Sequence, residues 1–331
     1  MNYMKRAHIF LFIHLFIFIL LVCTLLNAYI SLQVFPYFNI LSIVFPYLLC
    51  IHIIFTLIFI FKKKKNAWLA IVSLLLFYTP TKRWVRISFT ENQPQNGKLK
   101  IKVLSYNVKY GSKGWPKIRD YIRSQNADFI FVQEKDTNHA VRQDLVKYPS
   151  VILKTKHKIL RQQDLMNDYC SGNSFYADVL MHGKIIRIVN VYLEPFRLNK
   201  SMLKVKDNLE ATDKSQTFFG IFDHLIPTFR IHQMQVEKIR RAVETSPYPV
   251  IMAGDFNAAP NSWEYYHLEK GLNDAFLTAG NGSATSFHDY KIPLRLDYIF
   301  TSPHFKALKY KVHREVKLSD HFPVIAEFEL N

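Results

Sequence analysis

The sequence predicts a four-layer α/β sandwich of two sheets covered by helices, preceded by transmembrane helices. Two long apolar runs open the chain, strand-like and helix-like segments alternate through its last two thirds, and short polar motifs stand where strand-like runs end. Mixed strands and helices with turn-rich connections bury their apolar faces as packed layers. We expect a membrane region over residues 1–86, a polar linker over 87–97 and one further domain over 98–331.

The first two apolar runs, residues 9–26 and 40–61, are almost unbroken Ile, Leu, Phe and Val. About 20 such residues span a bilayer, so we expect membrane spans over about 9–28 and 40–61. A cleavable signal peptide is the alternative for the first run, but the run is too long and lacks a clean small-residue cleavage site. Polar groups inside the runs are expected to pack between helices, with a functional site as the alternative. They are His14, Cys23, Cys50 and His52.

A third apolar run, from Ala67 to Tyr78, reaches a spanning length only if its helix continues through Pro80 and covers about 66–85. An interfacial helix is the alternative. By the positive-inside rule, the basic residues before the first run and the Lys62–Lys65 cluster after the second are expected on the cytoplasmic side. The basic residues after the third run favour the cytoplasmic side for the start of the C-terminal domain, which conflicts with three spans. Three spans place the C-terminal domain outside the cytoplasm, and two place it inside. We favour three spans, in the cell (inner) membrane.

The formal net charge of +17 attracts polyanions, whether nucleic acid, anionic lipid headgroups or phosphorylated small molecules. No Arg-rich run interleaved with aromatic residues marks a nucleic-acid groove. A solvated basic surface without a specific partner fits equally well, so charge alone does not identify a ligand. The three cysteines form no disulfide framework, because two lie in apolar runs and Cys170 stands alone.

Within the domain, apolar runs predict strands and amphipathic stretches predict helices. The expected strands are 99–107, 127–134, 151–153, 174–181, 185–193, 250–254, 296–302 and 324–329. The expected helices are 115–125 and 227–243. Residues 154–173 and 197–220 are polar without periodicity and are expected to be surface loops, which either rim a site or are unselected insertions.

Five polar motifs follow these apolar runs. They are Ser105-Tyr106-Asn107-Val108, Val132-Gln133-Glu134, Gly254-Asp255-Phe256-Asn257, Arg295-Leu296-Asp297-Tyr298 and Leu318-Ser319-Asp320-His321. Any one of them has a turn or cap explanation. Five at strand ends indicate convergence on one anion and its metal, and hence phosphoester hydrolysis.

Oxygen-bearing side chains in these motifs suit a hard cation such as Mg²⁺, which takes one or two carboxylates and leaves positions for water and phosphate. Glu134 is a candidate ligand, and Asn107 can orient a phosphate oxygen or a metal-bound water. Asp255 can accept a proton from an attacking water. Asn257, on the same side of an extended chain, can hold that water or the phosphate. Gly254 permits close approach of a ligand.

The last motif places a carboxylate, Asp320, beside an imidazole, His321. A protonated His321 can stabilise charge on a pentavalent phosphorus. Asp297 can fix the tautomer of the ring and keep it charged near neutral pH.

From about residue 99 to 329 the chain resembles the endonuclease/exonuclease/phosphatase superfamily, the DNase I-like fold. The resemblance rests on the five motifs in order, on Asn190-Val191-Tyr192-Leu193 between them, and on Phe322-Pro323 after the last. It implies a catalytic domain in which Glu134 binds Mg²⁺ (or Mn²⁺), with Asn107 and Asp320 beside it. It also implies that Asp255 activates the nucleophilic water and that Asn257 orients that water and the phosphate. His321, oriented by Asp297, would neutralise the scissile phosphate, which Asn107 and Asn257 also contact.

Two positions depart from patterns common in that superfamily. Tyr192 stands where many members carry His and others Tyr, so its hydroxyl is expected to contact the phosphate. Lys109 stands where some nuclease members have an acid that extends the metal shell. A lysine there is expected either to bind phosphate or to be solvated.

Three functions fit the sequence. The first is a membrane-anchored, divalent-metal-dependent phosphodiesterase or phosphatase acting on a lipid headgroup or small phosphoester. The second is a membrane-anchored endonuclease or exonuclease, supported only by the positive charge. The third is a binding module that has lost catalysis, which the filled catalytic positions disfavour. The sequence indicates no protein partner.

Overall fold

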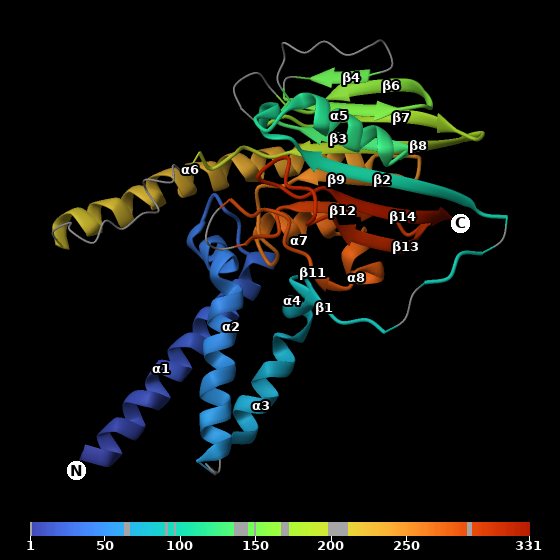
Figure 1. Cartoon of the computed structure of the whole chain (residues 1–331). Coiled ribbons are helices and arrows are strands. Elements are labelled where there is room, and N and C mark those ends of the chain that lie inside the picture. Colours follow the sequence, from blue (N-terminus) through green and yellow to red (C-terminus); the bar gives the residue numbers. More distant parts are fainter. Residues whose placement is uncertain are drawn as a thin grey trace.

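Two six-stranded sheets stack face to face at the centre of the molecule, and helices cover their outer faces (Figure 1). The computed structural model describes residues 2–62, 67–89, 92–95, 97–135, 145–148, 150–166, 172–197, 211–289 and 293–331. Helix α5 (Trp115–Ser124) covers one sheet, and α6 (Ala211–Glu244) with α7 (Trp263–Glu269) covers the other. The four-layer α/β sandwich predicted from the sequence is confirmed.

The strand order of the first sheet is β13-β14-β2-β3-β5-β4. Its strands are β2 (Leu99–Asn107), β3 (Phe129–Gln133), β4 (Leu145–Tyr148), β5 (Val151–Thr155), β13 (Phe305–Val312) and β14 (Val324–Leu330). The order of the second is β10-β12-β9-β8-β7-β6. Its strands are β6 (Lys158–Asp164), β7 (Phe175–Met181), β8 (Lys184–Tyr192), β9 (Val250–Asp255), β10 (Asn273–Asp274) and β12 (Asp297–Thr301).

Each sheet is built around one parallel pair. β2 runs parallel to β3 and β8 parallel to β9, whereas the other described pairings are antiparallel. A parallel pair needs a crossover connection, which contains α5 in the first sheet and α6 in the second. The carboxyl ends of these four central strands meet at one edge of the sandwich, where the polar motifs follow.

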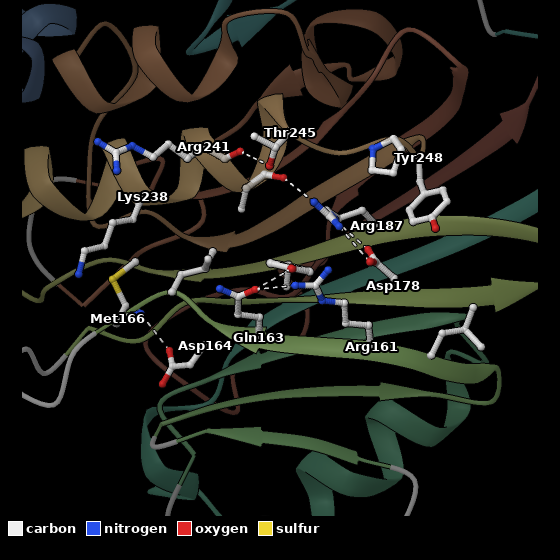
Figure 2. A pocket seen from close by; sticks show the side chains of 15 residues that line it. Arg161, Gln163, Asp164, Met166, Asp178, Arg187, Lys238, Arg241, Thr245 and Tyr248 are labelled. Atoms are coloured by element: carbon white, nitrogen blue, oxygen red, sulfur yellow. Dashed lines mark hydrogen bonds and ion pairs between the residues drawn. The ribbon is translucent and has the colours of Figure 1, made fainter.

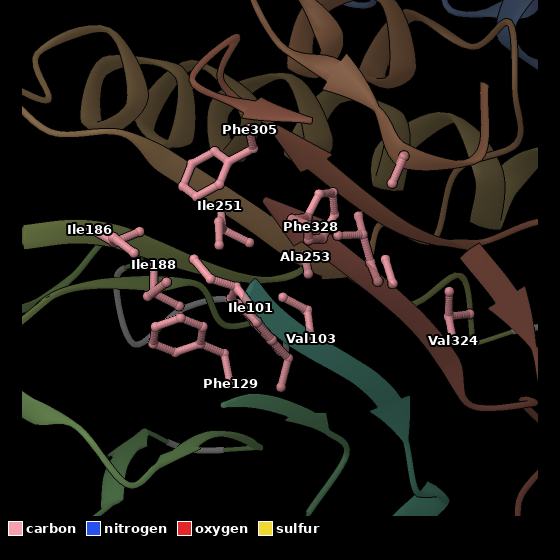
Figure 3. Packing of buried hydrophobic residues seen from close by; sticks show 14 of the residues in the cluster. Ile101, Val103, Phe129, Ile186, Ile188, Ile251, Ala253, Phe305, Val324 and Phe328 are labelled. Carbon is pink, nitrogen blue, oxygen red and sulfur yellow. The ribbon is translucent and has the colours of Figure 1, made fainter. Parts of the chain in front are cut away.

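The main core lies between the two sheets (Figure 3). Ile101 and Val103 of β2 face Ile251 and Ala253 of β9 across this layer. The alternate residues of β2 pack outward against α5, on which Ile118 and Ile122 are buried one turn apart. Because the central strands are buried on both faces, they are apolar nearly throughout, which is why their positions were predictable.

The strands expected from apolar runs are present, and two regions expected to be loops are partly regular. Strand β6 occupies the middle of residues 154–173, so the loop expectation was wrong there. β6 is the edge strand, and most of its side chains are exposed, so it carries no apolar alternation. Helix α6 starts at Ala211, within 197–220. The other parts of the two predicted loops include residues 167–171 and 198–210, which lie outside the described residues.

Two N-terminal helices are long and apolar enough to cross a membrane: α1 (Asn2–Leu25), extended by the 3₁₀ turn η1 (Leu26–Ala28), and α2 (Tyr37–Phe61). By length and composition alone, a signal sequence near the N-terminus passes the same test. Few of the described side chains in these helices are buried, and large apolar ones such as Phe12, Phe16 and Leu57 are exposed. An exposed apolar surface of this kind suits lipid contact better than the core of a soluble protein.

The third apolar run is not one continuous helix. It forms α3 (Ala67–Leu76) and α4 (Tyr78–Lys82), separated at Phe77. Pro80 lacks the N–H that would bond to the carbonyl of Leu76, which explains the break. The expected unbroken span over 66–85 is therefore absent from the described residues. The chain nevertheless returns through this region to the domain, alongside α2 (Figure 1).

The expected linker is attached to the domain along its described part. Just before the linker, Val85–Arg86 (β1) pairs with Gly282–Ser283 (β11), which follows helix α8 (Ala275–Ala279). Further along, Asn92 Nδ2 donates to the carbonyl of Ala307 at 2.8 Å, and the Gln95 N–H donates to the Glu329 carboxylate. These contacts fix the path of the connection over the domain.

Candidate active site

The side chains predicted to act together converge at the edge where the central strands end. Asn107 ends β2, Glu134 follows β3, Tyr192 ends β8 and Asp255 ends β9. Asp297 begins β12, which runs antiparallel to β9, so that Asp297 and Asp255 are paired in register. The remaining predicted residues are Asn257, Asp320 and His321, which lie on the adjoining turns.

Glu134 joins the two sheets through hydrogen bonds. Its Oε1 accepts from Asn107 Nδ2 at 2.9 Å and from Tyr192 Oη at 3.1 Å. Glu134 has a φ of 50°, a left-handed turn conformation that directs the chain away from β3. Among the described residues both bonds end on Oε1, which leaves Oε2 for a cation. The structure brings Tyr192 to this carboxylate.

Asp255 is fully buried at the centre of the site. Its Oδ2 accepts from Asn107 Nδ2 at 2.9 Å, and its Oδ1 accepts from the Asn257 N–H at 2.9 Å. Burial raises the pKa of Asp255 to about 7; His321 opposes this shift and Asp297 adds to it. A carboxylate with such a pKa can take up a proton from water near neutral pH.

Gly254 has a different role from the one expected. A Cβ at this position would lie 1.9 Å from the carbonyl oxygen of Val191 on β8, and the residue has a φ of 149°. The close approach is therefore made by the neighbouring strand, and no ligand is needed to explain the glycine. This packing sets the separation of β8 and β9 just before Tyr192 and Asp255.

Asn257 lies in a turn, with a φ of 44°, so the extended chain expected for 255–257 was wrong. Its Nδ2 donates to the Leu193 carbonyl at 3.0 Å. Because Asp255 Oδ1 holds the Asn257 backbone N–H, the turn still keeps the two residues adjacent. Among the described residues the amide oxygen of Asn257 accepts no hydrogen bond, which leaves it available to a ligand.

His321 lies between two carboxylates. Its Nδ1 is 2.7 Å from Asp297 Oδ2, and its Nε2 is 3.7 Å from Asp255 Oδ2. Burial opposes charging of the ring, but Asp297 and Asp255 together raise the pKa of His321 to about 10. The ring is therefore an imidazolium at neutral pH. The Ser286 hydroxyl, which sequence reasoning missed, accepts from the Asp297 N–H at 3.1 Å and helps to hold this strand start.

Asp320 is paired with a cation from its own chain. Lys109 Nζ contacts Asp320 Oδ2 and lies 3.2 Å from Asp289 Oδ2. Burial lowers the pKa of Lys109, but the two carboxylates more than offset this and raise it. Neither solvation alone nor free phosphate binding, the two roles expected for Lys109, describes this arrangement. Asp289 was missed, because no apolar run precedes it.

A divalent cation fits the Glu134 side of the site better than the His321 side. Asp255, Asp297 and His321 offer possible ligand atoms within 4.8 Å of one another. The Nδ1 of His321 already faces Asp297 at 2.7 Å, however, and its Nε2 faces Asp255. The free oxygen of Glu134 suits a hard cation that takes few carboxylates. The Mg²⁺ or Mn²⁺ assignment stays a prediction.

A separate cavity of about 650 Å³ lies between the C-terminal half of α6 and strands β6 to β8 (Figure 2). Arg187 at its wall makes a bidentate ion pair with Asp178 at 2.7 and 2.9 Å. Its guanidinium stacks 4.0 Å from the Tyr176 ring centroid. Arg187 lies at the opposite end of β8 from Tyr192, so the cavity is distinct from the site above.

The two-sheet fold and the cluster of carboxylates, amides and imidazole define a protein of the DNase I-like class. The chain belongs to the Endonuclease/Exonuclease/phosphatase family, whose model matches residues 104–321. Members of this family are in general phosphoester hydrolases, typically dependent on a divalent metal. Residues 7–84 match a separate domain of unknown function.

Solved structures with the same fold cover about the same part of the chain. A family protein from Bacteroides thetaiotaomicron has 17% identity and a TM-score of 0.51, over 71% of this chain and 99% of that one. A mannosyl-6-phosphatase from the same species has 19% identity and a TM-score of 0.46, over 69% and 99%. A humanized Danio rerio TDP2 has 17% identity and a TM-score of 0.48, over 69% and 98%. No curated protein matches the chain.

Proposed function

We propose that this protein is a membrane-anchored, divalent-metal-dependent phosphoesterase acting on a lipid headgroup or a small phosphoester. One observation carries the proposal: Asn107 Nδ2 bridges Glu134 and Asp255 at 2.9 Å each, while His321 lies 3.7 Å from the same Asp255 oxygen. A cation-binding carboxylate, a proton acceptor and a cationic ring thus lie around one point.

The residues divide the reaction between them. Asp255 accepts the proton of the attacking water, which the amide oxygen of Asn257 orients. The His321 imidazolium, held by Asp297, neutralises charge on the phosphate as the bond from the water oxygen to phosphorus forms and the ester P–O bond breaks. The leaving alkoxide takes a proton from solvent and departs as the alcohol. Tyr192 and Asn107 donate hydrogen bonds at the Glu134 carboxylate and keep it aimed at the site.

Glu134 would hold the metal ion, with Asn107 beside it. A bound Mg²⁺ or Mn²⁺ supplies Lewis-acid stabilisation of the phosphate oxygens and a water of lowered pKa. Asp320 also belongs to the proposed metal set, but its Lys109 partner supplies a positive charge at the same carboxylate. This ion pair would weaken the contribution of Asp320 to metal binding.

The N-terminal helices support a location of the catalytic domain outside the cytoplasm. α2 begins against the domain, where Asn39 contacts Glu264, and ends far from it at Phe61. Arg83, after α4, is again in contact with the domain through Glu269 at 3.0 Å. If α2 crosses a bilayer, the chain must therefore cross back between Phe61 and Arg83. The domain then lies opposite the Lys62–Lys65 cluster, which favours the cytoplasm.

The test is a substrate panel assayed with the full chain in detergent or vesicles. Sphingomyelin, a phosphomonoester, a chromogenic bis-ester and plasmid DNA are each supplied with Mg²⁺ and with chelator. We expect chelator-sensitive hydrolysis of a lipid or small phosphoester, and its loss in Asp255→Asn protein. Asp164→Asn is the matched control, because Asp164 is exposed on edge strand β6 and, among the described residues, accepts one hydrogen bond, from the Met166 N–H.

Three results would contradict the proposal. Hydrolysis that survives in Asp255→Asn protein would remove the mechanism. DNA cleavage far faster than lipid or small-ester turnover would favour the nuclease. No metal-dependent turnover of any substrate would favour a binding module.

A further inference from the structure

The N-terminal region is joined to the catalytic domain by buried polar side chains. Asn27 Nδ2 donates to the Asn261 carbonyl at 3.0 Å, and Arg83 donates to Asn261 Oδ1 at 3.1 Å. Asn39 adds a third contact, to α7. A flexible tether needs no such contacts, and polar groups removed from water are costly unless they are paired. The junction is therefore a specific interface.

Asn39 is the most completely bonded residue of this interface. It lies in the first turn of α2 and is buried, as is Glu264 in the first turn of α7. Its Nδ2 lies 2.8 and 3.1 Å from the two Glu264 oxygens, and its Oδ1 accepts from the Trp263 N–H at 2.7 Å. The Asn39 side chain thus donates to the Glu264 carboxylate and accepts from a backbone N–H in the first turn of α7.

The bonds continue from Glu264 into the domain. Glu264 Oε1 lies 2.7 Å from His232 Nδ1, on α6. The other ring nitrogen, Nε2, lies 2.7 Å from the carbonyl oxygen of Glu194. His232 and Glu264 are fully buried, so loss of one partner leaves the next without a replacement from water.

Glu194 follows directly on residues of the active site. Tyr192 contacts the candidate metal ligand, and the Leu193 carbonyl accepts from Asn257 Nδ2 at 3.0 Å. Leu193 N–H also donates to the Asp255 carbonyl at 3.2 Å. The backbone held by His232 is therefore the backbone that holds Asn257.

A second route reaches Asn257 from the other direction along the chain. Residues 258–262 connect Asn257 to α7, and Asn261 within them is bound by Asn27 and Arg83. Both sides of Asn257 thus depend on the N-terminal region.

We propose that the N-terminal helical region is a working part of the active site, and that Asn39 is a positioning residue acting through Glu264 and His232 on Asn257. Removing the Asn39 side chain frees the 193–194 backbone to shift, and Asn257 then orients water poorly. The helices therefore keep the site in its active geometry as well as anchoring it. This inference rests on the proposed hydrolysis for its kinetic readout.

The experiment compares Asn39→Ala with Gln33→Ala in the full chain. Gln33 belongs to the same N-terminal segment but bonds to α6 in a solvent-exposed contact with the Arg230 carbonyl. We expect Asn39→Ala to lower kcat by roughly 10- to 100-fold with little change in KM, because orientation is lost while phosphate contacts remain. Gln33→Ala should leave both constants within about twofold of the wild type.

Hydrogen exchange supplies a readout that needs no substrate. Backbone amides of 193–197 and 256–264 should exchange faster in Asn39→Ala protein, while those of β2 and β3 stay protected. A wild-type protein without hydrolytic activity would refute the proposed function but leave this measurement intact. Unchanged exchange together with unchanged kcat would overturn the positioning role.

A second pair of variants, in which the amide of Asn39 and the carboxylate of Glu264 are exchanged, tests the same coupling even if the alanine variant misfolds. N39D places a second carboxylate against Glu264 and should reproduce the loss of kcat. In the double variant N39D/E264Q, the amide of residue 264 donates and the carboxylate of residue 39 accepts, so the hydrogen bond forms in the opposite direction. This variant should recover at least part of kcat. Equal activity of N39D and the double variant would overturn the proposed coupling through Glu264.

Discussion

His321 shows at the scale of one residue how the site is charged. Two buried carboxylates, on Asp297 and Asp255, raise the pKa of its ring to about 10, so the cation that the proposed mechanism places at the phosphate forms without substrate. We expect His321→Gln to lower kcat by roughly 10²- to 10³-fold, the usual cost of removing one group that stabilises charge in the transition state. Steady-state kinetics on the best panel substrate measure it. His313→Gln, outside the site, should have no such effect, and equal losses in both variants would refute the role.

The same pair predicts the pH dependence of activity. Asp255 must be deprotonated to accept a proton, and its pKa is raised to about 7, so kcat/KM should rise with pH through about 7. His321 must be protonated, and its pKa is raised to about 10, so kcat/KM should fall as pH passes about 10. A pH–rate profile checks both limbs. If kcat/KM instead rose at about pH 4, the ordinary pKa of an Asp side chain, the buried Asp255 would not be the group that controls this limb.

Lys109 predicts a change in metal binding. Lys109→Met removes the cation paired with Asp289 and with Asp320, and Asp320 belongs to the proposed metal set. We expect tighter Mg²⁺ binding, by roughly tenfold, equivalent to about 1.4 kcal/mol. Calorimetric titration measures it. Lys113→Met is the control of equal charge, because among the described residues Lys113 bonds to backbone carbonyls alone. A matching gain there would indicate a general charge effect.

Much of the site was predictable because its residues end apolar strands. Asn107, Glu134 and Asp255 are visible in the sequence for that reason, and the structure brings them together. Ser286 and Asp289 were not predictable, because they lie in a segment without regular periodicity and reach the site only through the fold. The pairing of Lys109 with Asp320 joins residues far apart in the chain, and no local pattern encodes it.

At the scale of elements, the β8–β9 pair depends on Gly254. An alanine there combines positive φ with overlap against Val191, for a combined cost on the order of 3 kcal/mol. We expect Gly254→Ala to lower the midpoint of thermal unfolding by roughly 6–12 °C. Gly183→Ala is the matched control, with a φ of 78° and open space for a Cβ. Similar shifts in the two variants would mean that strand packing adds nothing to backbone strain.

Elements were predictable where they are buried on both faces and not where one face meets solvent. β2 and β9 read as apolar runs. The side chains of β6, at a sheet edge, are nearly all exposed, so its sequence lacks the apolar–polar alternation by which a strand is recognised. The break between α3 and α4 depends on Pro80, whose effect was underestimated against the apolar character of the whole run.

At the scale of the molecule, the path of the chain predicts three membrane crossings if α2 is a span. Single cysteines at Ser31 and Asn331, in a background where Cys23, Cys50 and Cys170 are Ser, should react with an impermeant maleimide on intact cells. A cysteine at Lys64 should react only after permeabilisation. Labelling of Lys64→Cys but not Asn331→Cys on intact cells would reverse the orientation.

The attachment of residues 92–95 to Ala307 and Glu329 has a consequence for how substrate is met. An enzyme on a flexible linker explores a volume set by the length of the linker. If the N-terminal helices span a bilayer, as proposed, the attachment instead holds the candidate active site at one height and one tilt above the lipid surface. Its encounter rate then scales with how densely copies populate the membrane and with how often a phosphoester visits that single layer of water.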